Sequence, residues 1–71
     1  MTVKLREYGE DSCEIVGSLN GREVICLTFS EGEWIVDMSR NLPLKLADAR
    51  EHIAVFNVVL AEADRWQELR G

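Results

Sequence analysis

The segment at residues 53–60 reads IAVFNVVL, and Asn57 is its only polar residue. It lies in a C-terminal region rich in Ala, Leu, Glu and Arg, with no glycine or proline between Pro43 and Gly71. Such a composition favours one long helix. A helix packed on a sheet needs a single apolar stripe, whereas this segment is apolar nearly all round for two turns. In a chain of 71 residues, this surplus apolar surface indicates a partner.

The first half of the chain has the pattern of short strands separated by turns. Asn20-Gly21 is the clearest signal, because a type I′ hairpin turn needs positive φ at both central positions. Polar or glycine-containing turns are also expected at residues 9–12 and 30–32. The segments between these turns alternate or are rich in apolar residues, which predicts strands at residues 2–8, 13–19, 22–29 and 33–38.

The predicted fold class is α+β, with a four-stranded antiparallel sheet in meander order and one long C-terminal helix packed on one face. Pro43 is tolerated near a helix start but not inside a helix. We therefore expect the helix to begin between Pro43 and Ala47 and to end near Leu69. Residues 1–71 are expected to form one domain, which at this length has only a small core.

Counting back from the Asn20-Gly21 turn gives a register for the central hairpin. Gly17 interrupts the second strand, which is typical of a bulge or of a close backbone approach. A regular register would pair Leu19 with Arg22, Gly17 with Val24 and Ile15 with Cys26, and would place Cys13, Ile15, Leu19, Val24 and Cys26 on the core face. The two cysteines would then lie diagonally, roughly 7 Å apart, which is too far for an easy disulfide. Both thiols are predicted to be free and buried.

On a helical wheel, the apolar residues of the long helix fall into two sets. One set follows a 3-4 spacing and is predicted to lie on the sheet. The other lies largely off that stripe and is predicted to form a homodimer interface, with a tryptophan near the helix end as its anchor. The sheet-facing set is Ala49, Ile53, Phe56, Leu60 and Ala63, and the dimer-interface set is Val55, Val58, Val59 and Trp66.

The chain is acidic, with a net charge of −5 and a pI near 4.7, which argues against direct binding to nucleic acid or to an anionic membrane. Alternate turns of a meander fall at the same end of the sheet, so two groups of carboxylates are expected to gather there. Such an edge would suit a protein partner with a basic surface, or it would be only a solvated, edge-protecting rim. We call this group the acidic rim and expect it to consist of Glu7, Glu10, Asp11, Glu14, Glu31, Glu33 and Asp37.

The sequence predicts no catalytic residues, no metal site and no cofactor. His52 is the only histidine and has no nucleophile near it in sequence, and the two cysteines are too far apart for a metal-binding pair. The glycines match no phosphate-binding loop. The N-terminus lacks the apolar segment of a signal peptide, and no apolar run approaches the ~18 residues of a membrane span. A cytoplasmic location with reduced thiols is expected.

These features predict a non-enzymatic protein-binding or inhibitor protein. In size and charge the chain is similar to phage-encoded inhibitors of bacterial defence complexes, of the anti-CRISPR type. This similarity implies an inhibitor that covers a basic, nucleic-acid-binding groove on a larger bacterial complex. The alternative is a small subunit, or an antitoxin-like partner, of a bacterial complex that acts through homodimerisation.

Overall fold

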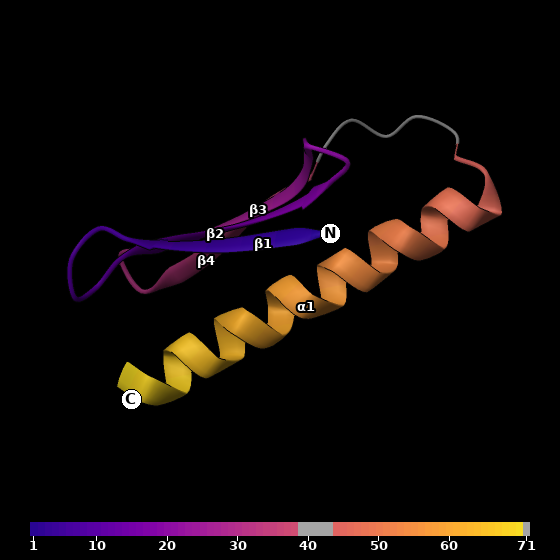
Figure 1. Ribbon diagram of the computed structural model, residues 1–71. Coiled ribbons are helices and arrows are strands. Elements are labelled where there is room, and N and C mark those ends of the chain that lie inside the picture. Colours follow the sequence, from indigo (N-terminus) through magenta and orange to yellow (C-terminus); the bar gives the residue numbers. More distant parts are fainter. Residues whose placement is uncertain (39–43, 71) are drawn as a thin grey trace.

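The computed structural model describes residues 1–38 and 44–70, which form a four-stranded sheet and one helix (Figure 1). The strands are β1 (Thr2–Glu7), β2 (Cys13–Leu19), β3 (Arg22–Ser30) and β4 (Glu33–Met38), and the helix is α1 (Leu46–Arg70). The strands pair in the order β1-β2-β3-β4, with every pair antiparallel. The predicted α+β meander followed by a long C-terminal helix is therefore confirmed.

The two tight hairpins use residues with positive φ. Asn20 and Gly21 have φ values of 52° and 77°, as a type I′ turn requires. Glu31 and Gly32 have values of 54° and 79°, so the β3–β4 hairpin uses the same geometry with a non-glycine residue in the left-handed region. The predicted Asn20-Gly21 turn is confirmed, and both turns give the flanking strands the twist that a sheet needs.

The register of the central hairpin differs from the regular one. Leu19 pairs with Arg22, but the register then shifts between Gly17 and Ser18. This bulge is the irregularity that Gly17 indicated, and it moves every later pair by one residue. The predicted Gly17–Val24 and Ile15–Cys26 pairs are therefore wrong: the observed pairs are Gly17–Ile25, Val16–Cys26 and Ile15–Leu27.

The core lies between the sheet and α1, which packs on β2, β3 and β1. The strands contribute one face of the sheet, and the bulge lets Val24 and Ile25 both be buried although they are neighbours in sequence. The buried apolar residues are Cys13, Ile15, Val24, Ile25, Leu27, Val55, Val59, Ala63 and Trp66.

The helix face that packs on the sheet is not the predicted one. Val55 and Val59 are fully buried and Trp66 is 4% exposed, whereas Ile53 and Leu60 are 56% and 47% exposed. The predicted sheet-facing stripe is thus wrong for Ile53 and Leu60. The glycine at the centre of β2 explains the choice: the ideal Cβ position of Gly17 lies 2.5 Å from Cγ1 of Val55 and 2.8 Å from Cγ2 of Val59. The helix approaches the sheet where a side chain is missing, and compact valines fit there.

Helix α1 is longer than the sheet that it covers. Its 25 residues span about 38 Å at 1.5 Å per residue, against about 30 Å for β3, the longest strand. Figure 1 shows the first turns of α1 extending past the strand ends, and the longest dimension of the molecule is 39 Å. Leu46, in the first of these turns, is 66% exposed. Among the described residues, no helix is long and apolar enough to cross a membrane.

The two cysteines are free, as predicted, but lie on opposite faces of the sheet. Cys13 pairs with Phe29 on the helix-facing side and is fully buried. Because of the bulge, Cys26 pairs with Val16 on the other face and is only half-buried, so the prediction that both are buried is wrong for Cys26. Desolvation raises the pKa of both thiols; the Phe29 backbone hydrogen bond partly offsets this for Cys13, and the Thr28 hydroxyl does so for Cys26.

Native-state labelling with a thiol reagent is expected to modify Cys26 slowly and to leave Cys13 unmodified until the protein unfolds. The thiolate is the reactive form, so the raised pKa of Cys26 should keep its labelling rate rising with pH beyond the range of an ordinary thiol. Mass spectrometry of peptides labelled over a pH series measures both rates. Equal native rates for the two cysteines would contradict the assignment of Cys13 and Cys26 to opposite faces.

Candidate protein-binding surfaces

The acidic rim gathers at the end of the sheet where the β1–β2 and β3–β4 connections lie. Glu7 pairs with Cys13 in the last pair of β1 and β2, and Glu33 pairs with Ser30 beside the second turn. Cys13 in turn pairs with Phe29, one residue before Ser30, so both connections are at the same end. Six members of the predicted rim lie at or next to this end: Glu7, Glu10, Asp11, Glu14, Glu31 and Glu33.

The seventh predicted member lies elsewhere. Asp37 pairs with Cys26, four residues along β4 from Glu33. At about 3.3 Å per residue, this places Asp37 about 13 Å from the Glu33 position. Including Asp37 in the rim was therefore wrong. Strand β4 is extended, so a residue four positions after Glu33 lies toward the opposite end of the strand. From here on, the acidic rim means the other six residues.

Two of the six rim carboxylates have cationic neighbours. Oε2 of Glu7 lies 2.9 Å from Nη2 of Arg70, and this pair joins β1 to the end of α1. Glu14 lies directly opposite Arg6 in the β1–β2 ladder, which is a favourable cross-strand combination. The remaining four are exposed and form no ion pair with any residue in 1–38 or 44–70: Glu10, Asp11, Glu31 and Glu33.

An aromatic cluster packs next to the acidic rim, at the same end of the sheet. The ring centroid of Phe29 lies 4.9 Å from that of Trp34 and 5.2 Å from that of Trp66. The indole Nε1 of Trp34 donates a 2.8 Å hydrogen bond to Oε1 of Gln67, and the Arg70 guanidinium lies 4.4 Å from the Trp66 ring centroid. These contacts join β3, β4 and α1 at the rim end, so the rim is presented by a packed part of the fold.

The predicted dimer-interface residues are mostly in the core. Val55, Val59 and Trp66 are buried within one chain, so a partner cannot contact them in this fold, and Trp66 is not the interface anchor that the sequence predicted. The reason is that the valines, with Ala63 and Trp66, form the stripe that packs on the sheet. Val58 is the one member of the predicted set that is exposed, at 39%.

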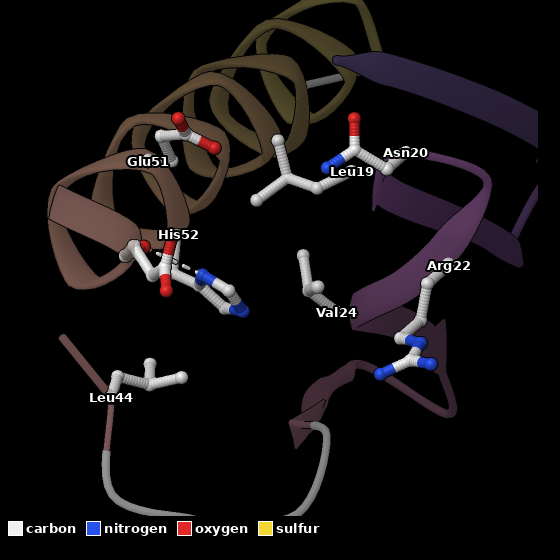
Figure 2. A pocket seen from close by; sticks show the side chains of 8 residues that line it. Leu19, Asn20, Arg22, Val24, Leu44, Glu51 and His52 are labelled. Atoms are coloured by element: carbon white, nitrogen blue, oxygen red, sulfur yellow. Dashed lines mark hydrogen bonds between the residues drawn. The ribbon is translucent and has the colours of Figure 1, made fainter.

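A pocket of about 350 Å³ lies at the opposite end of the molecule, between the β2–β3 hairpin and the first turns of α1 (Figure 2). Nδ1 of His52 lies 2.8 Å from the backbone oxygen of Asp48; because a carbonyl only accepts, Nδ1 carries the proton. Figure 2 shows the His52 ring and the Arg22 guanidinium on opposite sides of the pocket. The lining residues are Leu19, Asn20, Arg22, Val24, Leu44, Asp48, Glu51 and His52.

The chemistry of this pocket is mixed. Among the described residues that line it are one guanidinium, one imidazole and two carboxylates, and none of these residues carries a hydroxyl, thiol or amine nucleophile. The sequence analysis considered His52 but did not place Arg22 in the same pocket, because the hairpin end and the start of α1 meet only in three dimensions. Within residues 1–38 and 44–70, no three His, Cys, Asp or Glu side chains are grouped to hold a metal ion.

Comparison of the chain with protein-family models, with curated proteins and with solved structures finds no match.

Proposed function

We propose that this chain is a non-catalytic binding protein whose acidic rim covers a basic groove on a larger protein, of the kind that otherwise holds nucleic acid. The observation that supports the proposal is the gathering of six carboxylates around two adjacent connections, with four of them unpaired among the described residues. Such a group presents clustered negative charge, which is also what a phosphate backbone presents to a basic groove. The partner proposed is therefore one with clustered Lys and Arg, found in a bacterial complex that handles nucleic acid.

Binding by the rim would depend on charge complementarity more than on area. Complementary charge mainly sets the association rate and the choice of partner, and salt screens it over roughly 8 Å at physiological ionic strength. The association rate with the partner should therefore fall steeply as salt rises, while the dissociation rate changes less. An inhibitor of this kind competes with nucleic acid for the groove and needs no reaction step.

Reversing Glu10, Asp11 and Glu31 to lysine is expected to abolish partner capture. All three side chains are exposed, so the thermal midpoint should stay within a few degrees of the wild-type value. The matched control reverses Glu23, Asp37 and Glu51, which are also exposed and change the net charge by the same amount, but lie outside the rim. Immobilised wild-type, rim-variant and control proteins are used to capture partners from a bacterial lysate, and captured proteins are identified by mass spectrometry.

The decisive measurement uses the purified captured protein. Its binding to a labelled oligonucleotide is measured with increasing amounts of wild-type, rim-variant or control chain. The proposal expects displacement by the wild type and the control, and none by the rim variant. If the rim variant binds and displaces as well as the wild type, the rim is only a solvated edge and the proposal is wrong.

A further inference from the structure

The sheet has two open edges, one along β1 and one along β4. The strand order β1-β2-β3-β4 leaves each of these strands paired on one side only. An open edge presents a row of unpaired backbone N–H and C=O groups, with which a further strand can pair. Helix α1 packs on one face of the sheet, so it covers neither edge within the plane of the sheet (Figure 1). A strand can therefore be added at either edge without displacing the helix.

The β1 edge is basic on the outward face, by which we mean the face of the sheet turned away from α1. Leu5 pairs with the buried Ile15, so Leu5 and Val3 point to the helix-facing side. Lys4 and Arg6 alternate with them and point outward, and both are exposed. Leu5 is also 43% exposed. The β1 edge thus combines an apolar side next to the helix with a basic outward side.

The β4 edge has the same alternation with the opposite charge. Val36 pairs with the buried Leu27, so Val36 and Trp34 point to the helix-facing side. Glu33 and Asp37 alternate with them, point outward and are exposed. Val36 is 49% exposed, because the helix lies over the other three strands. The β4 edge thus combines an apolar side with an acidic outward side.

One antiparallel register matches the apolar sides of the two edges. If Val36 of one copy lies opposite Val3 of a second copy, then Trp34 lies opposite Leu5 on the same side. Aromatic and β-branched pairs of this kind stabilise neighbouring strands. Each apolar side chain that is exposed at an edge would then be covered by one from the other copy.

The same register matches the charges on the outward side. Glu33 of one copy lies directly opposite Arg6 of the second copy. Lys4 of the second copy lies diagonally between Glu33 and Asp37, within reach of a long side chain. Opposite charges therefore face each other along the outward side of this strand pair.

Pairing through identical edges lacks this match. In a β4–β4 pair, the outward charges of both copies are the carboxylates of Glu33 and Asp37. In a β1–β1 pair, the outward charges of both copies are the cations of Lys4 and Arg6. Like charges on neighbouring strands are destabilising. Charge thus favours the combination of β1 with β4.

The second copy would extend the sheet within its own layer. It repeats the first copy after four strands, which is about 19 Å at a strand spacing of about 4.8 Å. Packed helices need about 8–10 Å between their axes, so the α1 helices of successive copies clear each other. Neither sheet lies beneath the helix of the other copy. The arrangement therefore causes no overlap of the two layers.

We infer that β1 of one copy of this chain pairs with β4 of a second copy, antiparallel and head to tail, to form one continuous sheet. Each end of such an assembly keeps one free edge, so the assembly is open and can add further copies. The interface is a single pair of six-residue strands, a size typical of weak association. The residues reversed to test the proposed function, Glu10, Asp11 and Glu31, take no part in it, so the two are tested by different substitutions.

The first test measures the mass of the full-length chain by sedimentation equilibrium up to near-millimolar concentration. The average mass should rise continuously with concentration, without levelling at two copies, and should fall with added salt. Lys4→Glu with Arg6→Glu makes both edges acidic, and Glu33→Lys with Asp37→Lys makes both edges basic. Each double variant should weaken self-association at least about tenfold, because like charges then face each other.

Matched controls change the net charge equally without touching either edge. Lys45→Glu with Arg50→Glu matches the acidic variant, and Glu23→Lys with Glu51→Lys matches the basic one; all four residues are exposed. Both controls should associate as the wild type does. Circular dichroism checks that every variant is folded.

One substitution needs a second variant beside it. Arg6 lies opposite Glu14 within the chain, so Arg6→Glu also places like charges on β1 and β2. Lys4→Glu alone avoids this, since Lys4 lies opposite Val16. This single variant should still weaken self-association by about threefold.

The second test recombines the charges. An equimolar mixture of the two double variants should associate although each alone does not, because acidic edges then meet basic edges. A chain with all four substitutions should self-associate as the wild type does, since its β1 edge is acidic and its β4 edge is basic. In this chain identical edges still carry like charges, so only the head-to-tail combination explains the recovery.

Four outcomes would overturn the inference. A wild-type chain that stays monomeric to near-millimolar concentration excludes a second copy as the added strand. A mass that levels at two copies excludes an open, head-to-tail assembly. Self-association that survives both double variants uses another surface. Self-association that these variants break, but that the chain with all four substitutions does not recover, does not depend on opposite charges at β1 and β4.

Discussion

Replacing Trp66 with alanine is expected to lower the free energy of unfolding by about 3–5 kcal/mol, the range for truncating a large buried aromatic side chain. Trp66 is 4% exposed and contacts the rings of Phe29 and Trp34 at centroid distances of 5.2 and 5.8 Å. A 71-residue domain has a total stability on the order of 4–10 kcal/mol. The variant should therefore be largely unfolded well below the wild-type midpoint, as urea titrations followed by far-ultraviolet circular dichroism would measure.

The substitution Trp66→Phe is the matched control. The indole Nε1 of Trp66 is buried, and no described residue accepts a hydrogen bond from it. Phenylalanine keeps an aromatic ring against Phe29 and Trp34 and removes this unsatisfied donor, so two effects oppose each other. The cost should stay below about 1.5 kcal/mol. If alanine and phenylalanine cost the same, the aromatic cluster does not hold the rim end together.

Strand positions and turns could be predicted because their signals are local. Asn20-Gly21 and the segment at residues 30–32 select turns through the φ values that their residues tolerate, and alternation marks the strands between them. The gathering of most of the acidic rim followed from meander topology alone. These inferences need only the chain order and the preferences of single residues.

The register and the helix face could not be predicted because each depends on contacts across the fold. A single bulge beside Gly17 moved Cys26 to the other face of the sheet. Two apolar stripes compete on α1, and spacing alone favoured the one with larger residues. The other stripe packs on the sheet, because Gly17 has no side chain and so lets Val55 and Val59 approach β2 closely. Helix periodicity shows that a stripe exists but does not show which stripe meets a particular surface.

Replacing Gly17 with alanine is expected to destabilise the protein by at least about 2 kcal/mol, toward the upper part of the range for overpacking a core. In most strand positions the same change would stabilise, by about 0.5–1 kcal/mol, because alanine loses less backbone freedom on folding. Here a methyl group would lie 2.5 Å from Cγ1 of Val55, 2.8 Å from Cγ2 of Val59 and 3.0 Å from Cγ2 of Ile25. Valine in a helix has one strongly preferred rotamer, so these methyls cannot turn aside without cost.

A double-mutant cycle separates this steric effect from a change in the strand itself. Val55→Ala alone should cost about 2 kcal/mol, because the side chain is fully buried. Combined with Gly17→Ala, the cost should fall short of the sum of the two by about 1 kcal/mol, since the new methyl occupies part of the space that Val55 leaves. Ser18→Ala, at the neighbouring position on the other face, serves as the control and should change stability by less than about 0.5 kcal/mol. A stabilising Gly17→Ala, or strict additivity with Val55→Ala, would contradict the close approach of α1 to β2 on which the choice of helix face depends.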